Sequence, residues 1–142
     1  MARDMTPDEV RRFLLHGTRT GKVATVRADG RPHVAPIWFT LDGDDVLFTT
    51  WHESVKGRTL QRDPRVAISV DDETPPFSFV AIEGEATLSR DLDELRRWAT
   101  VIGGRYMGEA QAAAFGERNG VEGELLVRVR PTRIIGKAGV SE

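Results

Sequence analysis

Short runs of β-branched and other apolar residues alternate with polar residues along the chain, which is the pattern of strands with one buried face. The segments with this pattern are residues 22–28, 33–41, 46–50, 65–70, 79–88, 125–130 and 133–137. Asp29-Gly30 and Asp42-Gly43-Asp44 are turn sequences that separate the first three segments. We therefore expect the first half of the chain to form an antiparallel meander.

Helical periodicity appears in four other segments. The predicted helices run from Thr6 to about Gly17, from Val55 to about Arg62, from Asp91 to Ile102 and from about Glu109 to Glu117. Thr6 to Glu9 form a capping box, and Gly103-Gly104 is expected to end the third helix. The order of helices and strands predicts one antiparallel barrel with helices on its outside.

Composition narrows the possible classes of protein. A chain of 142 residues fits a single domain, 1–142, and 39% hydrophobic with 30% charged residues is typical of a folded chain. The sequence has no apolar stretch of about 20 residues and no secretory signal, so we expect a cytoplasmic protein that does not bind membranes. A net charge of -2 argues against nucleic-acid binding, and the lack of cysteine excludes disulfides and thiolate chemistry.

Familiar catalytic motifs are missing. His16, His33 and His52 do not have metal-ligand spacing, so no metal site is predicted. The sequence also lacks a Gly-x-Ser-x-Gly elbow, a Gly-x-Gly-x-x-Gly fingerprint and a nucleotide phosphate loop. No catalytic residue can be named, as is expected of an enzyme whose cofactor carries the chemistry.

Residues 49–58 form the most informative stretch, because a strand ends there and a helix begins. The unpaired amides of a helix N-terminus, from Val55 onward, suit a phosphate. Lys56 and Arg58 lie in the same first turn, where positive charge opposes the helix dipole. A bound anion would turn this unfavourable placement into a favourable one.

A structural explanation of the same stretch is equally open at this point. In that interpretation Ser54 is only a helix cap and the two cations are solvated. Thr49 and Thr50 are then ordinary strand residues. Sequence electrostatics alone does not separate the two interpretations.

Pro36-Ile37-Trp38-Phe39 is the second stretch of interest, on a strand predicted to lie beside residues 46–50. Proline cannot donate to a strand ladder, so it favours an edge or a bulge whose free amides can meet a planar ring. Trp38 could then wall a pocket for a flat aromatic ligand. Packing of the same residues in the barrel core or a dimer interface explains them equally well.

Two further segments have open roles. The loop that contains Pro75-Pro76-Phe77 either reaches a neighbouring subunit or covers the barrel mouth. Tyr106 and Met107 either line a substrate cavity or pack near a helix end.

Taken together, these segments resemble the split β-barrels of the pyridoxamine 5'-phosphate oxidase type, also called the FMN-binding split-barrel fold. The matching stretches are residues 21–26, 29–39, 46–50, 54–56, 60–67 and 84–86, so the resemblance covers most of residues 6–135. Within this superfamily the chain is most similar to the actinobacterial deazaflavin-dependent oxidoreductases, which use coenzyme F420 rather than FMN.

The resemblance implies a cofactor groove at a homodimer interface. The cofactor phosphate is expected at Ser54, Val55 and Lys56, with Thr49 and Thr50 beside the ring.

The same resemblance places two more segments in the groove. It implies that the backbone of Pro36, Ile37 and Trp38 faces the deazaflavin and that Phe77 reaches it from the partner chain.

The function implied is a reductase that transfers a hydride from reduced F420 to an electron-poor double bond of a small molecule. An FMN-dependent oxidoreductase of the same fold and a non-catalytic carrier or sensor of the cofactor are the alternatives. No residue identifies the substrate.

Overall fold

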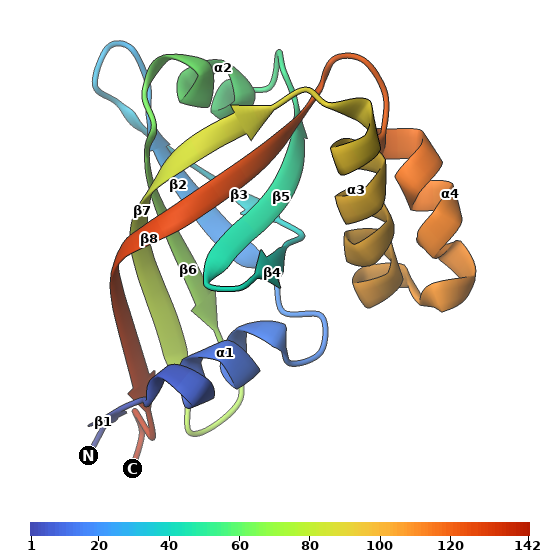
Figure 1. The fold of residues 1–142 in the computed structure, drawn as a ribbon. Helices are drawn as coiled ribbons and strands as arrows, with labels where there is room; N and C mark the ends of the chain where they lie inside the picture. Colours follow the sequence, from blue (N-terminus) through green and yellow to red (C-terminus); the bar gives the residue numbers. More distant parts are fainter.

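The computed structural model describes residues 1–142, which form one curved antiparallel sheet with four helices around it (Figure 1). The helices are α1 (Pro7–Leu15), α2 (Val55–Arg62), α3 (Leu92–Met107) and α4 (Glu109–Asn119). The strands are β1 (Arg3–Asp4), β2 (Gly21–Val26), β3 (Pro32–Ile37), β4 (Thr40–Asp42), β5 (Asp45–Trp51), β6 (Arg65–Asp71), β7 (Phe79–Ser89) and β8 (Glu124–Ala138). None of the helices is both long enough and apolar enough to cross a membrane.

The sheet is a split barrel, as predicted. Its strand order is β3-β2-β6-β7-β8-β5-β4, with β1 added beside β8. The two outermost strands, β3 and β4, are joined in the chain by only Trp38 and Phe39. Three peptide steps span at most roughly 11 Å, so the sheet must curl until its two edges approach each other.

The prediction of one strand over residues 33–41 is wrong. The strand is interrupted at Trp38-Phe39. Before the interruption β3 pairs with β2, and after it β4 pairs with β5. The expected position of Pro36 to Trp38 beside residues 46–50, and with it the continuous meander, is therefore also wrong. The break is stable because the backbone of Phe39 bonds to side chains of α3 instead of to a neighbouring strand.

The one or two closing strands expected at 125–130 and 133–137 form the single long strand β8. A bulge on β8 interrupts its pairing with β7, because Glu83 pairs with Arg133 whereas Gly84 pairs with Pro131. Thr132 is the extra residue of this bulge, and its hydroxyl donates to the Glu83 carbonyl at 3.2 Å. A bulge is a favourable place for Pro131, which cannot donate to the ladder.

The core fills the inside of the barrel with side chains from every large strand and from α1. Its completely buried members include Val23, Phe39, Phe48, Val70, Val80 and Val127. A smaller cluster lies outside the barrel, where Leu95 and Trp98 of α3 cover Leu47 and Leu126. Full burial of one such side chain contributes roughly 1.5–3 kcal/mol.

Gly103-Gly104 does not end α3, contrary to the prediction. The helix continues to Met107 and ends at Gly108, which has φ 94°. A Cβ on Gly103 would lie 2.4 Å from Cβ of Phe115, so this glycine permits close contact between α3 and α4. The sequence signal was real, but it marked a helix contact rather than a helix end.

The last turn of α3 fixes the position at which the strand is interrupted between β3 and β4. The Arg105 guanidinium donates to three carbonyl oxygens, those of Leu14 at 2.7 Å, Gly17 at 3.0 Å and Phe39 at 2.7 Å. The Tyr106 hydroxyl donates to the Arg19 carbonyl at 2.7 Å and accepts the Phe39 amide at 3.3 Å. Two neighbouring side chains thus hold the β3–β4 break and the connection from α1 to β2.

Gly103→Ala should lower the free energy of unfolding by about 1–3 kcal/mol, because the added methyl overlaps Phe115. Urea unfolding followed by circular dichroism measures this. Gly104→Ala is the matched control, since its Cβ would lie 3.0 Å from the movable carboxylate of Glu109 and 3.3 Å from Ala112. A Gly103→Ala protein as stable as the wild type would contradict the packing role.

Arg105→Met should destabilise the fold by about 2–4 kcal/mol, because it leaves three carbonyl acceptors without their charged donor. Arg12→Met at an exposed position of α1 should change stability by less than about 0.5 kcal/mol. The same unfolding assay compares them, and equal effects of the two substitutions would argue against the anchoring role of Arg105.

Candidate functional site

The start of α2 is locked onto the end of β5 by the Ser54 hydroxyl. Ser54 Oγ accepts the Gly57 amide at 3.0 Å and donates to the Trp51 carbonyl at 2.8 Å. Thr50 Oγ1 lies 2.7 Å from Ser54 Oγ. Because the Ser54 proton is used on Trp51, Thr50 is the donor in this pair. Ser54 is therefore a helix cap, as one interpretation of the sequence expected.

Gly57 is a part of this junction that sequence reasoning missed. A Cβ at this position would lie 2.3 Å from the Trp51 carbonyl oxygen and 2.9 Å from Ser54 Oγ. Only glycine lets the first turn of α2 approach the strand end this closely. The signal was present in the sequence as a glycine inside a short predicted helix, where glycine needs a reason.

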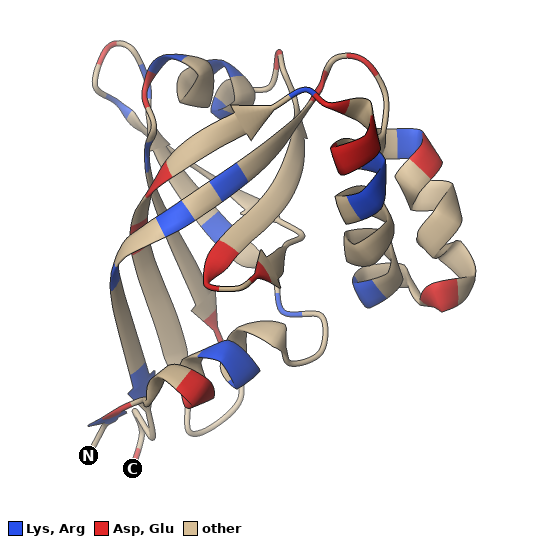
Figure 2. Ribbon diagram, in the orientation of Figure 1, with Lys and Arg blue, Asp and Glu red and all other residues tan.

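The first turn of α2 offers donors that no group of the chain uses. The amides of Val55 and Lys56 make no hydrogen bond, and the Lys56 side chain is half-buried without an ion pair. Burial lowers the pKa of Lys56. As Figure 2 shows, α2 carries Lys and Arg but no Asp or Glu. This combination of free amides and an unpaired cation suits an anion.

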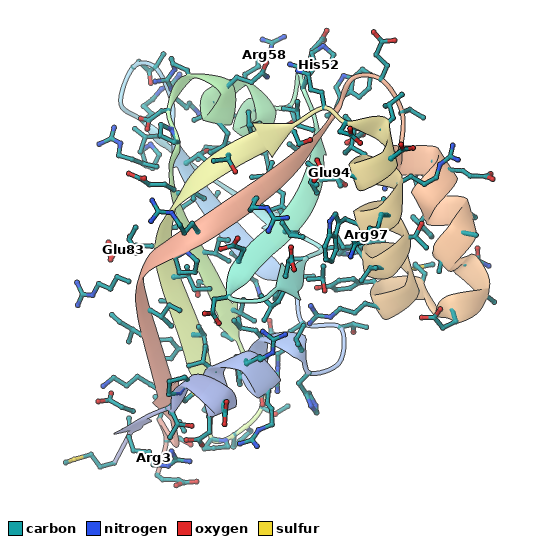
Figure 3. All side chains as sticks on the ribbon, viewed as in Figure 1. Arg3, His52, Arg58, Glu83, Glu94 and Arg97 are labelled. Carbon is teal, nitrogen blue, oxygen red and sulfur yellow. The ribbon has the colours of Figure 1, made fainter.

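Arg58 belongs to the same turn but is exposed. In Figure 3 its side chain lies at the α2 end of the barrel, the same end as His52. His52 is fixed by Gly123, whose carbonyl oxygen lies 2.9 Å from both its backbone N and its Nδ1. This end of the molecule is thus built from β5, α2 and the start of β8.

Glu124 is an acidic neighbour of this turn that the sequence did not reveal. It pairs with Trp51 across β5 and β8, and it is half-buried. Burial raises the pKa of Glu124, while the positive charges of Lys56, Arg118 and His52 oppose that rise. No ion pair joins Glu124 to Lys56, so the Glu124 carboxylate lies more than 4.0 Å from Lys56 Nζ.

Thr49 and Thr50, both predicted beside a cofactor ring, point to opposite faces of β5. Thr50 faces the barrel interior, is 6% exposed and uses its hydroxyl on Ser54. Thr49 lies on the outer face and is partly exposed. Of the two, only Thr49 has a side chain available to a ligand outside the barrel.

The free edge of β3 is defined by the turn before it. The Arg27 amide donates to the Arg31 carbonyl at 2.9 Å, so Arg27 and Arg31 are a hydrogen-bonded pair. Such pairs alternate along antiparallel strands, so the backbone N–H and C=O groups of residues 33, 35 and 37 point toward β2. Those of Pro32, Val34 and Pro36 point away from it. Because proline has no N–H, Val34 is the single amide donor on this edge.

Ile37 and Trp38, the other predicted residues of this segment, separate into core and surface. Ile37 is 5% exposed and belongs to the barrel core. Trp38 is 39% exposed and stacks on Tyr106 with 5.0 Å between ring centroids and 5° between planes. Phe115 of α4 touches it at a tilt, 5.7 Å away. Trp38 is thus a rigid aromatic platform at the split of the barrel.

Tyr106 packs against Trp38, and its hydroxyl makes hydrogen bonds to the backbone of Arg19 and Phe39. Burial raises the pKa of Tyr106. Met107, at the end of α3, is half exposed. The packing interpretation therefore describes Tyr106.

Phe77 lies far from α2 within one chain. It is 44% exposed, has φ 59° and borders an open depression of about 640 Å³ beside Asp71 and Phe79. Asp71 ends the strand that begins at Arg65 near α2, and six strand steps correspond to roughly 20 Å. The structure does not bring Phe77 together with Lys56 in a single copy.

The outer face of β2, β6 and β7 carries small side chains and no covering helix. Its centre is a shallow depression of about 280 Å³ that is lined by strand residues alone. Ala24, Ala67, Ser69 and Ala81 form much of its floor. At its border Glu83 projects away from the barrel (Figure 3).

Both the sequence and the fold of this chain are similar to those of known proteins. The sequence matches the family described as PNPOx_N, pyridoxamine 5'-phosphate oxidase, over residues 6–137.

Three solved structures are similar along most of their length. A conserved hypothetical protein from Mycobacterium tuberculosis has a TM-score of 0.80 at 27% identity, over 92% of this chain and 82% of the other. A structure described as an F420 reductase has a TM-score of 0.69 at 29% identity, over 87% of this chain and 94% of the other. An FAD-binding protein from Mesorhizobium loti shares the fold, with a TM-score of 0.71 at 16% identity over 96% of both chains. The family match spans nearly all of the sequence and the barrel has the expected topology, so this chain belongs to the pyridoxamine 5'-phosphate oxidase family.

Proposed function

We propose that this protein is a coenzyme F420-dependent reductase of electron-poor, unsaturated small molecules. The observation that carries the proposal is the unpaired, half-buried Lys56 beside two free amides at the start of α2. The 29% identity to an F420 reductase favours the deazaflavin over FMN. The chain would act as one cofactor-binding domain, residues 1–142, in the cytoplasm.

The cofactor phosphate fits the first turn of α2. Lys56 would supply the charge, and the Val55 and Lys56 amides would donate two hydrogen bonds to the phosphate oxygens. The Ser54 hydroxyl is already used within the chain, so it would hold the turn in shape rather than bind the phosphate. When bound, reduced F420 would supply the hydride from C5 of its ring.

The protein's share of the reaction would be orientation and exclusion of water. Thr49 on the outer face and the free edge of β3 would hold the ring, while Trp38 offers a flat surface on which a planar substrate can stack. Tyr106 would not act as a proton donor, because its hydroxyl proton is held by the Arg19 carbonyl. No side chain is assigned as the general acid.

Two copies of the chain are needed to complete this groove. The outer face of β2, β6 and β7 is uncovered and carries small side chains, which allows another sheet to approach closely. Phe77 lies at the opposite end of β6 from α2, so its loop can meet a cofactor only in another subunit. We therefore place the cofactor between the subunits of a homodimer.

FMN is the alternative cofactor, because its phosphate would use the same free amides and the same Lys56. An FMN oxidoreductase would be yellow as purified. A carrier or sensor would bind F420 tightly but reduce no activated alkene.

Lys56→Ala should weaken F420 binding by about 1.5–3 kcal/mol, or roughly 10- to 150-fold, which is the contribution of a hydrogen bond to a charged group. A fluorescence titration of the cofactor-free protein measures the dissociation constant, with FMN titrated in parallel. Arg12→Ala removes the same charge from exposed α1 and should leave the affinity unchanged. Equal affinity of the Lys56→Ala and wild-type proteins would refute the anchor, and tighter binding of FMN would favour the alternative.

Ala81→Arg should convert the dimer to a monomer, because it places a long charged side chain in the centre of the uncovered sheet face. Sedimentation velocity gives the oligomeric state, and the monomer should bind F420 at least tenfold more weakly, about 1.4 kcal/mol. Ala113→Arg on the exposed side of α4 is the control and should remain dimeric. A wild-type protein that is monomeric at micromolar concentration would refute the shared groove.

A further inference from the structure

We infer that Glu124 is a specificity-determining residue, which makes the anion site at α2 prefer a phosphodiester with one negative charge over a phosphomonoester with two. This inference rests on the proposed function for the position of the phosphate. It adds a reason, within this chain, for the choice between the two candidate cofactors.

The backbone places Glu124 next to the anion site. Glu124 pairs directly with Trp51, and the Trp51 carbonyl accepts both the amide and the hydroxyl of Ser54. The turn between them is fixed on its other side, since the His52 amide donates to the Gly123 carbonyl. One strand pair and one helix cap therefore separate the backbone of Glu124 from the free amides of α2.

Glu124 and Lys56 influence each other without being in contact. Both side chains are half-buried, and no ion pair joins them. Burial lowers the pKa of Lys56 and raises that of Glu124, and the charge of each opposes the shift of the other. The charges of Arg118 and His52 also oppose the rise in the pKa of Glu124. An anion that approaches Lys56 therefore enters the field of Glu124 as well.

This arrangement treats the first and second charges of a phosphate differently. The first charge gains Lys56 and two amide donors, which outweigh the half-buried Glu124 and the exposed Glu53 that precedes Ser54. A second charge brings no new hydrogen-bond donor. It gains attraction to Lys56 but is repelled by Glu124, and it must lose more of its hydration to enter a half-buried site.

The two candidate cofactors differ in this property. The phosphate of F420 is a diester with a single negative charge. The phosphate of FMN is a monoester, which carries close to two charges above its second pKa of about 6. Glu124 would therefore penalise FMN more strongly than F420.

Glu122 offers a matched control from the same turn. It is an acid two residues earlier in the sequence, but it is exposed and lies outside the β5–β8 pairing. Charge repulsion by an exposed acid is screened by water and salt. Glu122→Gln therefore removes the same charge without removing the proposed selectivity.

The test compares each ligand with its phosphate-free form, which for FMN lacks the phosphate alone and for F420 lacks the phosphate together with the acidic tail esterified to it. Fluorescence titrations give dissociation constants for FMN, riboflavin, F420 and the phosphate-free deazaflavin chromophore of F420. Glu124→Gln should raise the affinity of FMN relative to riboflavin roughly tenfold, but that of F420 relative to its chromophore no more than about threefold. Glu122→Gln should change neither ratio. Glu124→Ala, checked by its melting temperature, repeats the test if the glutamine variant folds poorly.

The outcomes separate this inference from the proposed function. An unchanged ratio of FMN to riboflavin in both Glu124 variants, or equal rises for FMN and F420, would overturn the role of Glu124 even if the wild type prefers F420. A wild type that prefers FMN would refute the F420 assignment, while the ratio of FMN to riboflavin would still decide on Glu124. Failure of all four ligands to bind would overturn both.

Discussion

The two-residue link between the opposite edges of the sheet is the constraint on which the rest of the structure depends. Trp38 and Phe39 must cross from β3 to β4 without a strand partner, so their backbone groups need other acceptors and donors. Arg105 and Tyr106 supply these for Phe39 from α3, while the Phe39 ring fills the core. The same link presents Trp38 on the surface, so the closure of the barrel and the proposed substrate platform have a common origin.

Local signals in the sequence predicted the helices and most strands correctly. The capping box at Thr6 and the cap at Ser54 are both present, because a side chain that bonds to its own helix amides needs only neighbouring residues. The break at Trp38 could not be predicted in this way, since it depends on hydrogen bonds to residues more than 60 positions away. The prediction that α3 ends at Gly103 was wrong for a similar reason, because the residue that requires a glycine there, Phe115, belongs to another helix.

In the candidate site, too, local features could be predicted from the sequence and features that depend on distant contacts could not. The sequence identified the free first turn of α2 and Lys56, which follow from local helix geometry. It did not identify Glu124 or the role of Gly57, because both depend on the pairing of β5 with β8 and on the approach of α2 to Trp51. It also treated Thr49 and Thr50 alike, although neighbouring residues in a strand face opposite sides and only one of them has a free hydroxyl.

The position of β8 has a consequence for how the protein is made. The last of the eight strands along the chain lies in the interior of the sheet, between β7 and β5. Until it emerges from the ribosome, the long inner edges of both neighbouring strands are unpaired and open to other nascent chains. The barrel therefore closes only after β8 has been translated, and a chain cut short before β8 would contain two parts of the sheet with no strand to join them.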